Sequence, residues 1–295
     1  MICHFLEYLQ VERRYSQLTV NAYGHDLREF CAYLNLQEEN FEPKKIQTED
    51  VRSWMISMLD AGVSARSVNR KLSSLRSFWK YLLRTGYTDI DITQRIIPPK
   101  TDKPLPVFYK EDEMQRAQLT EEFADDFVSV RNNLIIEMFY ETGMRRAELR
   151  GLTDSDIDLA QHQLRVFGKR RKERIVPFGE RLSNGIEEYM AYREAEFAEK
   201  QTENFFFLNE QGKQMSENGI YKVVHERMSE VSTLKKQSPH VLRHTFATTM
   251  LNNGADINTI KELLGHANLA ATEVYTHTTF EQIMKVYHQA HPRSK

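Results

Sequence analysis

The chain has 295 residues, of which 40% are hydrophobic and 28% charged, so it is long for one domain and has the composition of a globular protein. It contains no apolar run near the roughly 18 residues of a membrane span. Its beginning lacks the basic and then apolar order of a secretion signal, which predicts a cytoplasmic location. Cys3 and Cys31 are too few and too far apart in sequence for a disulfide framework or a thiolate metal site.

The formal net charge of −2 argues mildly against a nucleic-acid partner. Attraction to phosphate is local, however, because exposed charges are screened over about 8 Å at physiological salt. Clusters of basic residues therefore matter more than the total.

Residues 1–87 predict four amphipathic helices. Apolar side chains recur at helical spacing in residues 2–9, 23–34, 51–58 and 68–82. The expected boundaries are N-caps at Thr19, Thr48 and Ser64 and stops at Gly62 and Gly86. On a helical wheel of about 100° per residue, the fourth helix carries a basic stripe opposite its apolar residues, made of Arg66, Arg70, Lys80 and Arg84. Such a stripe is either an ordinary solvated face or a DNA contact.

The segment PPKTDKPLP, residues 98–106, holds four of the chain's eight prolines and interrupts both helix and strand. It predicts a linker between a domain of residues 1–97 and a domain of residues 107–295. A proline-rich surface loop within one domain is the alternative, and it explains less.

The second half predicts a mainly helical domain with a small sheet. Helical patterns cover residues 111–119, 130–140, 181–200, 216–231, 256–264 and 280–288, and residues 205–208 read as a buried strand. Two β-rich runs around a polar turn predict a hairpin in residues 163–179. The tip of this hairpin is basic and consists of Lys169, Arg170, Arg171 and Lys172. A basic tip is usually a solvated turn, but a β-hairpin is also able to enter a DNA groove.

Arg145 is expected at a turn, because Thr142 and Gly143 break the preceding helix. An arginine in this position is able to point inward toward an anion. A salt bridge with Glu141 or Glu148 is the competing interpretation.

The stretch from Ser238 to His277 gathers basic and aromatic residues at helix starts and turns. Ser238 and Pro239 suit a helix start, and the i, i+3, i+4 spacing places His240, Arg243 and His244 on one face. His266 follows the helix stop at Gly265. Tyr275 lies in a segment with few long apolar residues and is expected to be exposed.

Together with TGMRRAELRGL, residues 142–152, this stretch resembles the tyrosine recombinase family, whose signature is Arg, Lys, His-x-x-Arg, His and a nucleophilic Tyr in chain order. The matching positions are Arg145, Lys169, His240, Arg243, His266 and Tyr275. Both ends of the chain resemble the Xer subgroup, its XerC branch more than its XerD branch. The resemblance implies an N-terminal four-helix, SAM-like core-DNA-binding domain followed by a mainly α catalytic domain with a small antiparallel β-sheet.

The resemblance also implies a metal-independent and cofactor-free enzyme that cuts and rejoins DNA through a 3′-phosphotyrosyl intermediate. Tyr275 would be the nucleophile, His240 the base and Lys169 the general acid, with Lys172 in reserve. The negative charge that develops on phosphate would be stabilised by the cations and donors of Arg145, Arg243 and His266. His244 is expected to be buried and structural.

The implied partners are a double-stranded DNA recombination site and a tetrameric synapse of protomers, with a homologous recombinase among them. The implied role is the resolution of chromosome dimers at cell division, and the helix at 280–288 is expected to dock on a neighbouring subunit. A mobile-element integrase, a type IB topoisomerase and a non-catalytic DNA-binding protein are the alternatives. A zinc hydrolase using His240 and His244 is disfavoured, because the intervening residues lack the glutamate of H-E-x-x-H.

Overall fold

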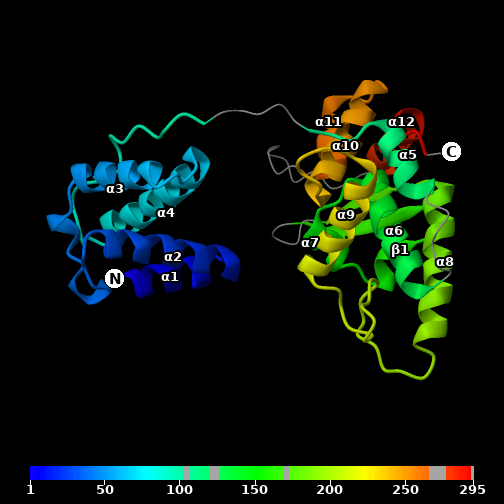
Figure 1. Cartoon of the computed structure of the whole chain (residues 1–295), viewed down its shortest axis with the longest axis horizontal. Helices are drawn as coiled ribbons and strands as arrows, with labels where there is room; N and C mark the ends of the chain where they lie inside the picture. The colour runs from blue at the N-terminus through cyan, green and yellow to red at the C-terminus, as the bar shows by residue number, and fades with distance from the viewer. Residues whose placement is uncertain (102–106, 120–125, 169–172, 266–276, 294–295) are drawn as a thin grey trace. The chain divides into compact units, whose positions relative to one another are not determined.

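The computed structural model describes residues 1–101, 107–119, 126–168, 173–265 and 277–293. The chain divides into two compact units, Met1–Pro104 and Leu105–Lys295, and each unit has its own hydrophobic core (Figure 1). None of the described helices combines the length and the apolar character that crossing a bilayer requires.

The N-terminal unit confirms the prediction of four helices. They are α1 (Ile2–Val11), α2 (Gln17–Tyr33), α3 (Thr48–Asp60) and α4 (Ala65–Arg84), with two short 3₁₀ turns, η1 (Glu38–Asn40) and η2 (Pro43–Lys45), between α2 and α3. Helix α2 lies against α1 and α4, and α3 lies against α4. The apolar faces meet in an aromatic core, in which Phe30 contacts Trp54 and Trp79 at centroid distances of 5.0 and 6.3 Å.

The helix boundaries follow side-chain hydrogen bonds. Ser64 caps α4 as predicted, accepting a hydrogen bond from the Ser67 amide. The predicted caps Thr19 and Thr48 are wrong by one to three positions, since α2 is capped by Ser16 and α3 starts after Gln47. At α2 the Ser16 hydroxyl accepts a hydrogen bond from the Thr19 amide, and at α3 the Asp50 carboxylate accepts one from the Gln47 amide.

A buried carboxylate joins α2 to α4. Asp26 is 1% exposed and accepts two hydrogen bonds from Arg70, at 2.6 and 2.7 Å, and one from the Ser74 hydroxyl at 2.6 Å. The hydrogen bond to Asp26 raises the pKa of Arg70 above its ordinary value. One member of the predicted basic stripe is therefore occupied in holding the N-terminal unit together.

The C-terminal unit is mainly helical with a three-stranded antiparallel sheet, as predicted. Its helices are α5 (Glu111–Leu119), α6 (Phe127–Thr142), α7 (Arg146–Arg150), α8 (Glu180–Glu196), α9 (Glu217–Val231), α10 (Pro239–Asn252), α11 (Ile257–Leu264) and α12 (His277–Ala290), with the 3₁₀ turn η3 (Asp154–Asp156). The strands β1 (Ile157–Asp158), β2 (Gln163–Phe167) and β3 (Glu173–Pro177) lie in the order β1-β2-β3. Helix α6 is buried on nearly all sides and contacts α8, α9 and α10.

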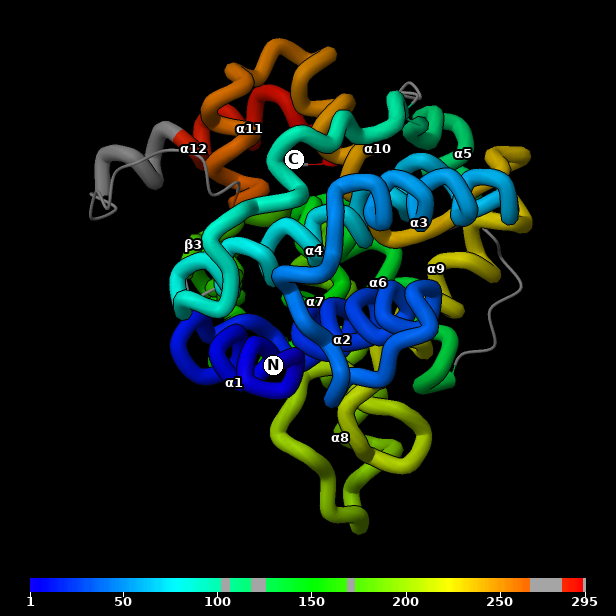
Figure 2. Tube along the Cα trace, turned by 90° about the vertical axis from the view of Figure 1, so that its left-hand side faces the viewer, coloured from blue at the N-terminus to red at the C-terminus, as the bar shows by residue number. Residues whose placement is uncertain are grey.

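One expectation for this unit is wrong. Residues 206–208 are buried and Phe205 is partly buried, but the segment joins no sheet, because the Phe206 amide bonds to the Leu152 carbonyl and only Leu208 of this segment forms a bridge, with Gln214. The tail helix α12, which is expected to dock on a neighbouring subunit, packs beside α10 and α11 of its own unit (Figure 2). Ile283 and Tyr287 are 4% and 0% exposed there, since they complete the apolar core of the unit.

A glycine turn ends α6 and leads into α7. Gly143 is in the left-handed region with φ +58°, and a Cβ there would lie 2.4 Å from Cδ1 of Phe246 and 2.9 Å from Cδ2 of Leu264. Close packing and the backbone angle therefore both require glycine at this position.

Gly143→Ala should lower the free energy of unfolding by about 1–2 kcal/mol for the left-handed backbone and by a further ~1–3 kcal/mol for overpacking against Phe246. Gly254→Ala is the matched control, because Gly254 has φ +86° and open space around its Cα. Urea unfolding of both variants measures the difference. Equal losses would contradict the packing role of Gly143.

Arg70→Met should destabilise the N-terminal unit by about 1–3 kcal/mol, because it leaves the buried Asp26 carboxylate without its main donors. Lys80→Met, on the exposed side of the same helix, should leave the unfolding midpoint nearly unchanged. Thermal unfolding of the two variants tests this difference. A stable Arg70→Met protein would show that Ser74 alone satisfies Asp26.

Candidate active site

Arg145 occupies the turn between α6 and α7, immediately before the first residue of α7. Its backbone amide and its Nη1 donate to the Glu148 carboxylate at 2.8 and 2.7 Å, and its Nη2 donates to the Gly265 carbonyl at 3.2 Å. The side chain remains 38% exposed. Two of its five N–H groups are thus used in holding it, and the guanidinium still faces solvent.

Arg243 projects from α10 and is 8% exposed. Its Nη1 and Nη2 donate to the Gly143 and Leu264 carbonyls, each at 2.6 Å. Burial lowers the pKa of Arg243 to about 10, and the nearby charge of Arg145 adds to this effect. Arg243 still carries its charge at neutral pH.

Arg145 and Arg243 meet at the C-terminal end of α11, where they donate to the Gly265 and Leu264 carbonyls. A third arginine, Arg174 of β3, joins them there, with its Nε donating to the Leu263 carbonyl at 2.6 Å. Three successive carbonyls, of Leu263, Leu264 and Gly265, therefore each accept from a different arginine. Because the final carbonyls of a helix have no partner within it, these donors satisfy them and also favour the negative end of the helix dipole.

Sequence reasoning missed Arg174 and considered Glu148 only as a salt-bridge partner of Arg145, and the structure contains that salt bridge. Glu148 is buried and accepts from Arg174 at 2.8 and 3.1 Å as well as from Arg145. Burial opposes ionisation of this carboxylate, but the hydrogen bonds and charges of the two arginines outweigh it, so the pKa of Glu148 lies below its ordinary value. The signal available in the sequence was the placement of Arg174 at an inward position of its strand, two residues before the inward Val176.

The charges in this cluster do not balance. Within the described part of this cluster, three guanidinium groups, of Arg145, Arg174 and Arg243, lie near one carboxylate, Glu148, which leaves an excess of positive charge near the partly exposed Arg145. Fixed cations in such an arrangement suit an anion with developing negative charge, such as a phosphodiester under attack.

His240 lies at the start of α10 with its ring exposed. Neighbouring protein atoms still remove part of the water around His240, and this desolvation lowers the pKa of His240 below its ordinary value. The positive charges of Lys236, Arg146 and Arg243 lower the pKa further. The imidazole is therefore neutral at pH 7 and able to accept a proton.

His244 is exposed, so the expectation that it is buried and structural is wrong. The residues facing the core from α10 are Leu242, Phe246 and Met250, and His244 falls on the other side of that helix with His240. In the described part of the chain, His, Cys, Asp and Glu side chains nowhere gather in groups of three that could hold a metal ion.

The predicted Lys169, Arg170, Arg171 and Lys172 at the hairpin tip, together with His266 and Tyr275, lie outside the described residues. The structure does describe the residues next to the hairpin tip and next to His266. Strands β2 and β3 on either side of the tip pair in register, with Phe167 opposite Glu173, and Gly265 is one of the residues bonded to Arg145.

The predicted basic stripe on α4 is not uniform. Arg70 is bound to Asp26, and Arg84 lies over the Tyr8 ring at 4.1 Å and donates to its hydroxyl at 2.9 Å. Arg66 and Lys80 are exposed, and neither forms an ion pair with another described residue. These two remain the members of the stripe best placed to meet a phosphate.

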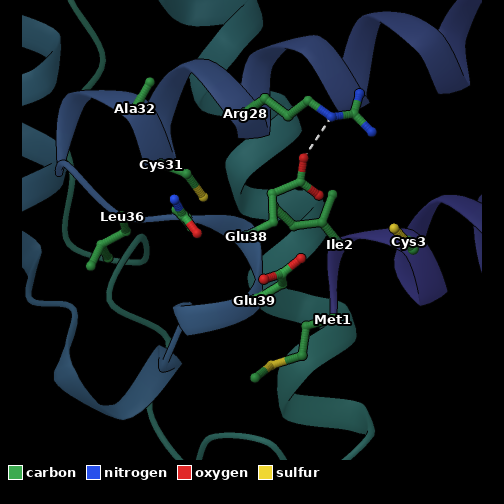
Figure 3. Close-up of a pocket in the computed structure, with 10 residues that line it drawn as sticks. Met1, Ile2, Cys3, Arg28, Cys31, Ala32, Leu36, Glu38 and Glu39 are labelled. Atoms are coloured by element: carbon green, nitrogen blue, oxygen red, sulfur yellow. Dashed lines mark hydrogen bonds and ion pairs between the residues drawn. The ribbon is translucent and has the colours of Figure 1, made fainter.

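A cavity of about 660 Å³ lies away from this cluster, in the N-terminal unit, between the start of α1 and the end of α2 (Figure 3). Its lining includes Cys3, Cys31 and the Arg28–Glu38 ion pair of 2.7 Å. Burial raises the pKa of the Cys31 thiol to about 11, so this cysteine is a protonated and unreactive thiol at neutral pH. The cavity contributes no group to the arginine cluster.

Known protein families match both units. The model of the phage integrase family matches residues 109–282, and that of the phage integrase N-terminal SAM-like domain matches residues 2–86. The chain is 36% identical over 294 residues to the tyrosine recombinase XerC of Bacillus pumilus, covering 98% of this chain and 95% of the relative. It is 36% identical over 290 residues to the tyrosine recombinase XerD of Halalkalibacterium halodurans, covering 98% and 97%.

Solved structures share the fold. The XerH site-specific recombinase bound to a palindromic difH substrate aligns with a TM-score of 0.72 at 21% identity, over 98% of this chain and 84% of that one. The integrase of the Tn1549 transposon in complex with transposon right end DNA aligns with a TM-score of 0.69 at 18% identity, over 96% and 98%. The matched models, the relatives along nearly the whole chain and the shared fold agree, and the chain belongs to the phage integrase family of tyrosine recombinases.

Proposed function

We propose that this recombinase breaks and rejoins DNA at the surface formed by Arg145, Arg243 and His240, with Tyr275 as its nucleophile. The observation that carries the proposal is the fixing of Arg145 and Arg243 to the backbone at residues 264–265, directly before His266 in the chain. Two residues of the signature, Arg145 and Arg243, are thus bonded to the backbone immediately before a third, His266.

The chemistry requires an excess of positive charge. Negative charge grows on the phosphate oxygens as the tyrosine oxygen bonds to phosphorus, so donors that are already in place stabilise the transition state without reorganising. Arg145 and Arg243 supply these donors, and His266 adds a further one. The resulting 3′-phosphotyrosyl bond conserves the energy of the broken phosphodiester, and the free 5′ hydroxyl is able to reverse the step.

Proton transfer is assigned to two other groups. Tyrosine, with an ordinary pKa near 10, needs a base at neutral pH, and the neutral His240 is the candidate. The leaving 5′ oxygen needs a proton, and a lysine on the hairpin between β2 and β3 supplies it. Lys169 is the first candidate because it follows Gly168 at the end of the first strand, and Lys172 is the second.

We propose a role in resolving chromosome dimers, because the relatives that match along 98% of the chain are named XerC and XerD. The mobile-element integrase among the structural neighbours supports only the fold, at 18% identity. The proposed domains are residues 1–97 and 107–295, joined by a linker at 98–106, and each would contact the DNA site. Four protomers, including a homologous recombinase, would form the synapse in the cytoplasm, where the chromosome lies.

Tyr275→Phe should bind duplex DNA with unchanged affinity but form no covalent adduct on a nicked suicide substrate, because only the hydroxyl is removed. Gel separation of protein–DNA adducts measures this. Tyr221→Phe, at a tyrosine that is 37% exposed on α9, is the control and should retain adduct formation. An adduct that persists in the Tyr275→Phe protein would place the nucleophile elsewhere.

Lys169→Ala should slow cleavage by about 10²–10⁴-fold, the range usual for loss of a general acid, with little change in binding. A substrate with sulfur at the bridging 5′ position has a leaving group that needs no proton, so it should largely restore the rate. Arg243→Ala should not be rescued in this way. Rescue of Lys172→Ala in place of Lys169→Ala would transfer the role to Lys172, and rescue of neither would reject acid catalysis by a hairpin lysine.

A further inference from the structure

Arg174 has no role in the recombinase signature, yet its side chain donates three hydrogen bonds within the arginine cluster, whereas the side chains of Arg145 and Arg243 donate two each. It is 4% exposed on β3, and it donates to both oxygens of Glu148 and to the Leu263 carbonyl. A lysine could not form this set, because only the planar guanidinium bonds to a carboxylate through two nitrogens while a third donates elsewhere.

Arg174 also packs against the turn that ends α11. Gly265 has φ +64°, and a Cβ at that position would lie 3.1 Å from Nη1 and 3.3 Å from Cδ of Arg174. The arginine thus contacts α7 through Glu148 and the end of α11 through Leu263 and Gly265. It fixes these two segments relative to each other.

The sharing of Glu148 affects the positive charge that Arg145 presents to an anion. Among the described residues, Glu148 is the one carboxylate bonded to both Arg145 and Arg174. With Arg174 present, the carboxylate charge is shared between two cations, so Arg145 keeps part of its charge available to an anion. Without Arg174, a buried Glu148 would either draw Arg145 more fully onto itself or take up a proton and stop holding it.

We propose that Arg174 is a positioning residue of the recombinase, which sets the place and the effective charge of Arg145 by sharing Glu148 and by holding the Leu263 carbonyl. This inference rests on the proposed function, in which Arg145 stabilises negative charge on the scissile phosphate. It adds a residue that never touches DNA to the set on which cleavage depends.

The competing explanation is that Arg174 only stabilises the fold. Arg131 offers a matched comparison, because it is also buried, at 3% exposed, and also bonds to a carbonyl and a carboxylate, of Leu208 and Glu210. Arg131 makes these contacts on α6, and Leu208 and Glu210 belong to no part of the arginine cluster. A purely structural arginine should behave as Arg131 does.

The test compares Arg174→Met, Arg174→Lys and Arg131→Met in the full-length protein. Each variant is assayed for unfolding temperature, for DNA affinity by fluorescence anisotropy and for single-turnover cleavage of a suicide substrate. Cleavage is measured on the natural phosphodiester and on a methylphosphonate, which is neutral because a methyl group replaces one non-bridging oxygen. Arg145→Ala serves as the reference for loss of charge stabilisation.

Arg174→Met should cleave the phosphodiester about 10²-fold more slowly than the wild type, as expected when an electrostatic donor loses its position. Its defect should be much smaller on the methylphosphonate, as for Arg145→Ala, because less negative charge has to be stabilised there. Arg174→Lys should fall between Arg174→Met and the wild type. Arg131→Met should lose the same fraction of activity on both substrates.

The pH profile adds a second readout. In the wild type, the pKa of Glu148 is held below its ordinary value by Arg174 and Arg145 against the effect of burial. Removing Arg174 raises that pKa, so Glu148 takes up a proton as the pH falls and the acid side of the Arg174→Met rate profile moves to higher pH. Equal losses on both substrates with an unmoved acid side would overturn the proposal. If Arg145→Ala itself shows no smaller defect on the methylphosphonate, the proposed role of Arg145 fails and not the role of Arg174 alone.

Discussion

The C-terminal end of α11 is the constraint on which the catalytic unit depends. Three carbonyls without helical partners accept from three arginines that come from α10, β3 and the turn before α7. Each arginine is expensive to bury, and one carboxylate cannot neutralise three guanidinium groups. The backbone carbonyls and the helix dipole offset part of that cost, and the protein retains a concentration of positive charge beside the partly exposed Arg145.

Glycine makes this arrangement sterically possible. Gly143 and Gly265 both have positive φ, and both lie against the cluster: the Gly143 carbonyl accepts from Arg243, and the Gly265 carbonyl accepts from Arg145. Each turn redirects the chain after a helix while turning a carbonyl toward a guanidinium. A side chain at position 143 would contact Phe246, and one at position 265 would contact Arg174. The conformation of the two turns and the positions of the guanidinium groups therefore depend on the same close packing.

The sequence predicted the elements well where periodicity is strong. Four N-terminal helices, the hairpin and the helical second unit follow from apolar spacing, and α5 has the predicted bounds. The contacts that set the charge of the site could not be predicted, because Glu148, Arg174 and Leu263 are distant in sequence and meet only in the folded unit. The burial of His244 was predicted wrongly for a related reason, because burial depends on which face of a helix its neighbours cover, and His244 is exposed.

The net charge of the chain was a poor predictor of a nucleic-acid partner for the same physical reason. The net charge of −2 counts every cation equally, whereas the structure divides them by partner. Arg70 has a buried carboxylate and Arg84 a tyrosine ring and hydroxyl, so α4 presents fewer available charges than its sequence suggests. At the end of α11 the opposite holds, because three cations share one carboxylate. The local positive charge available to an anion depends on how many cations remain uncompensated after folding. Only the contacts of the folded protein determine how many these are.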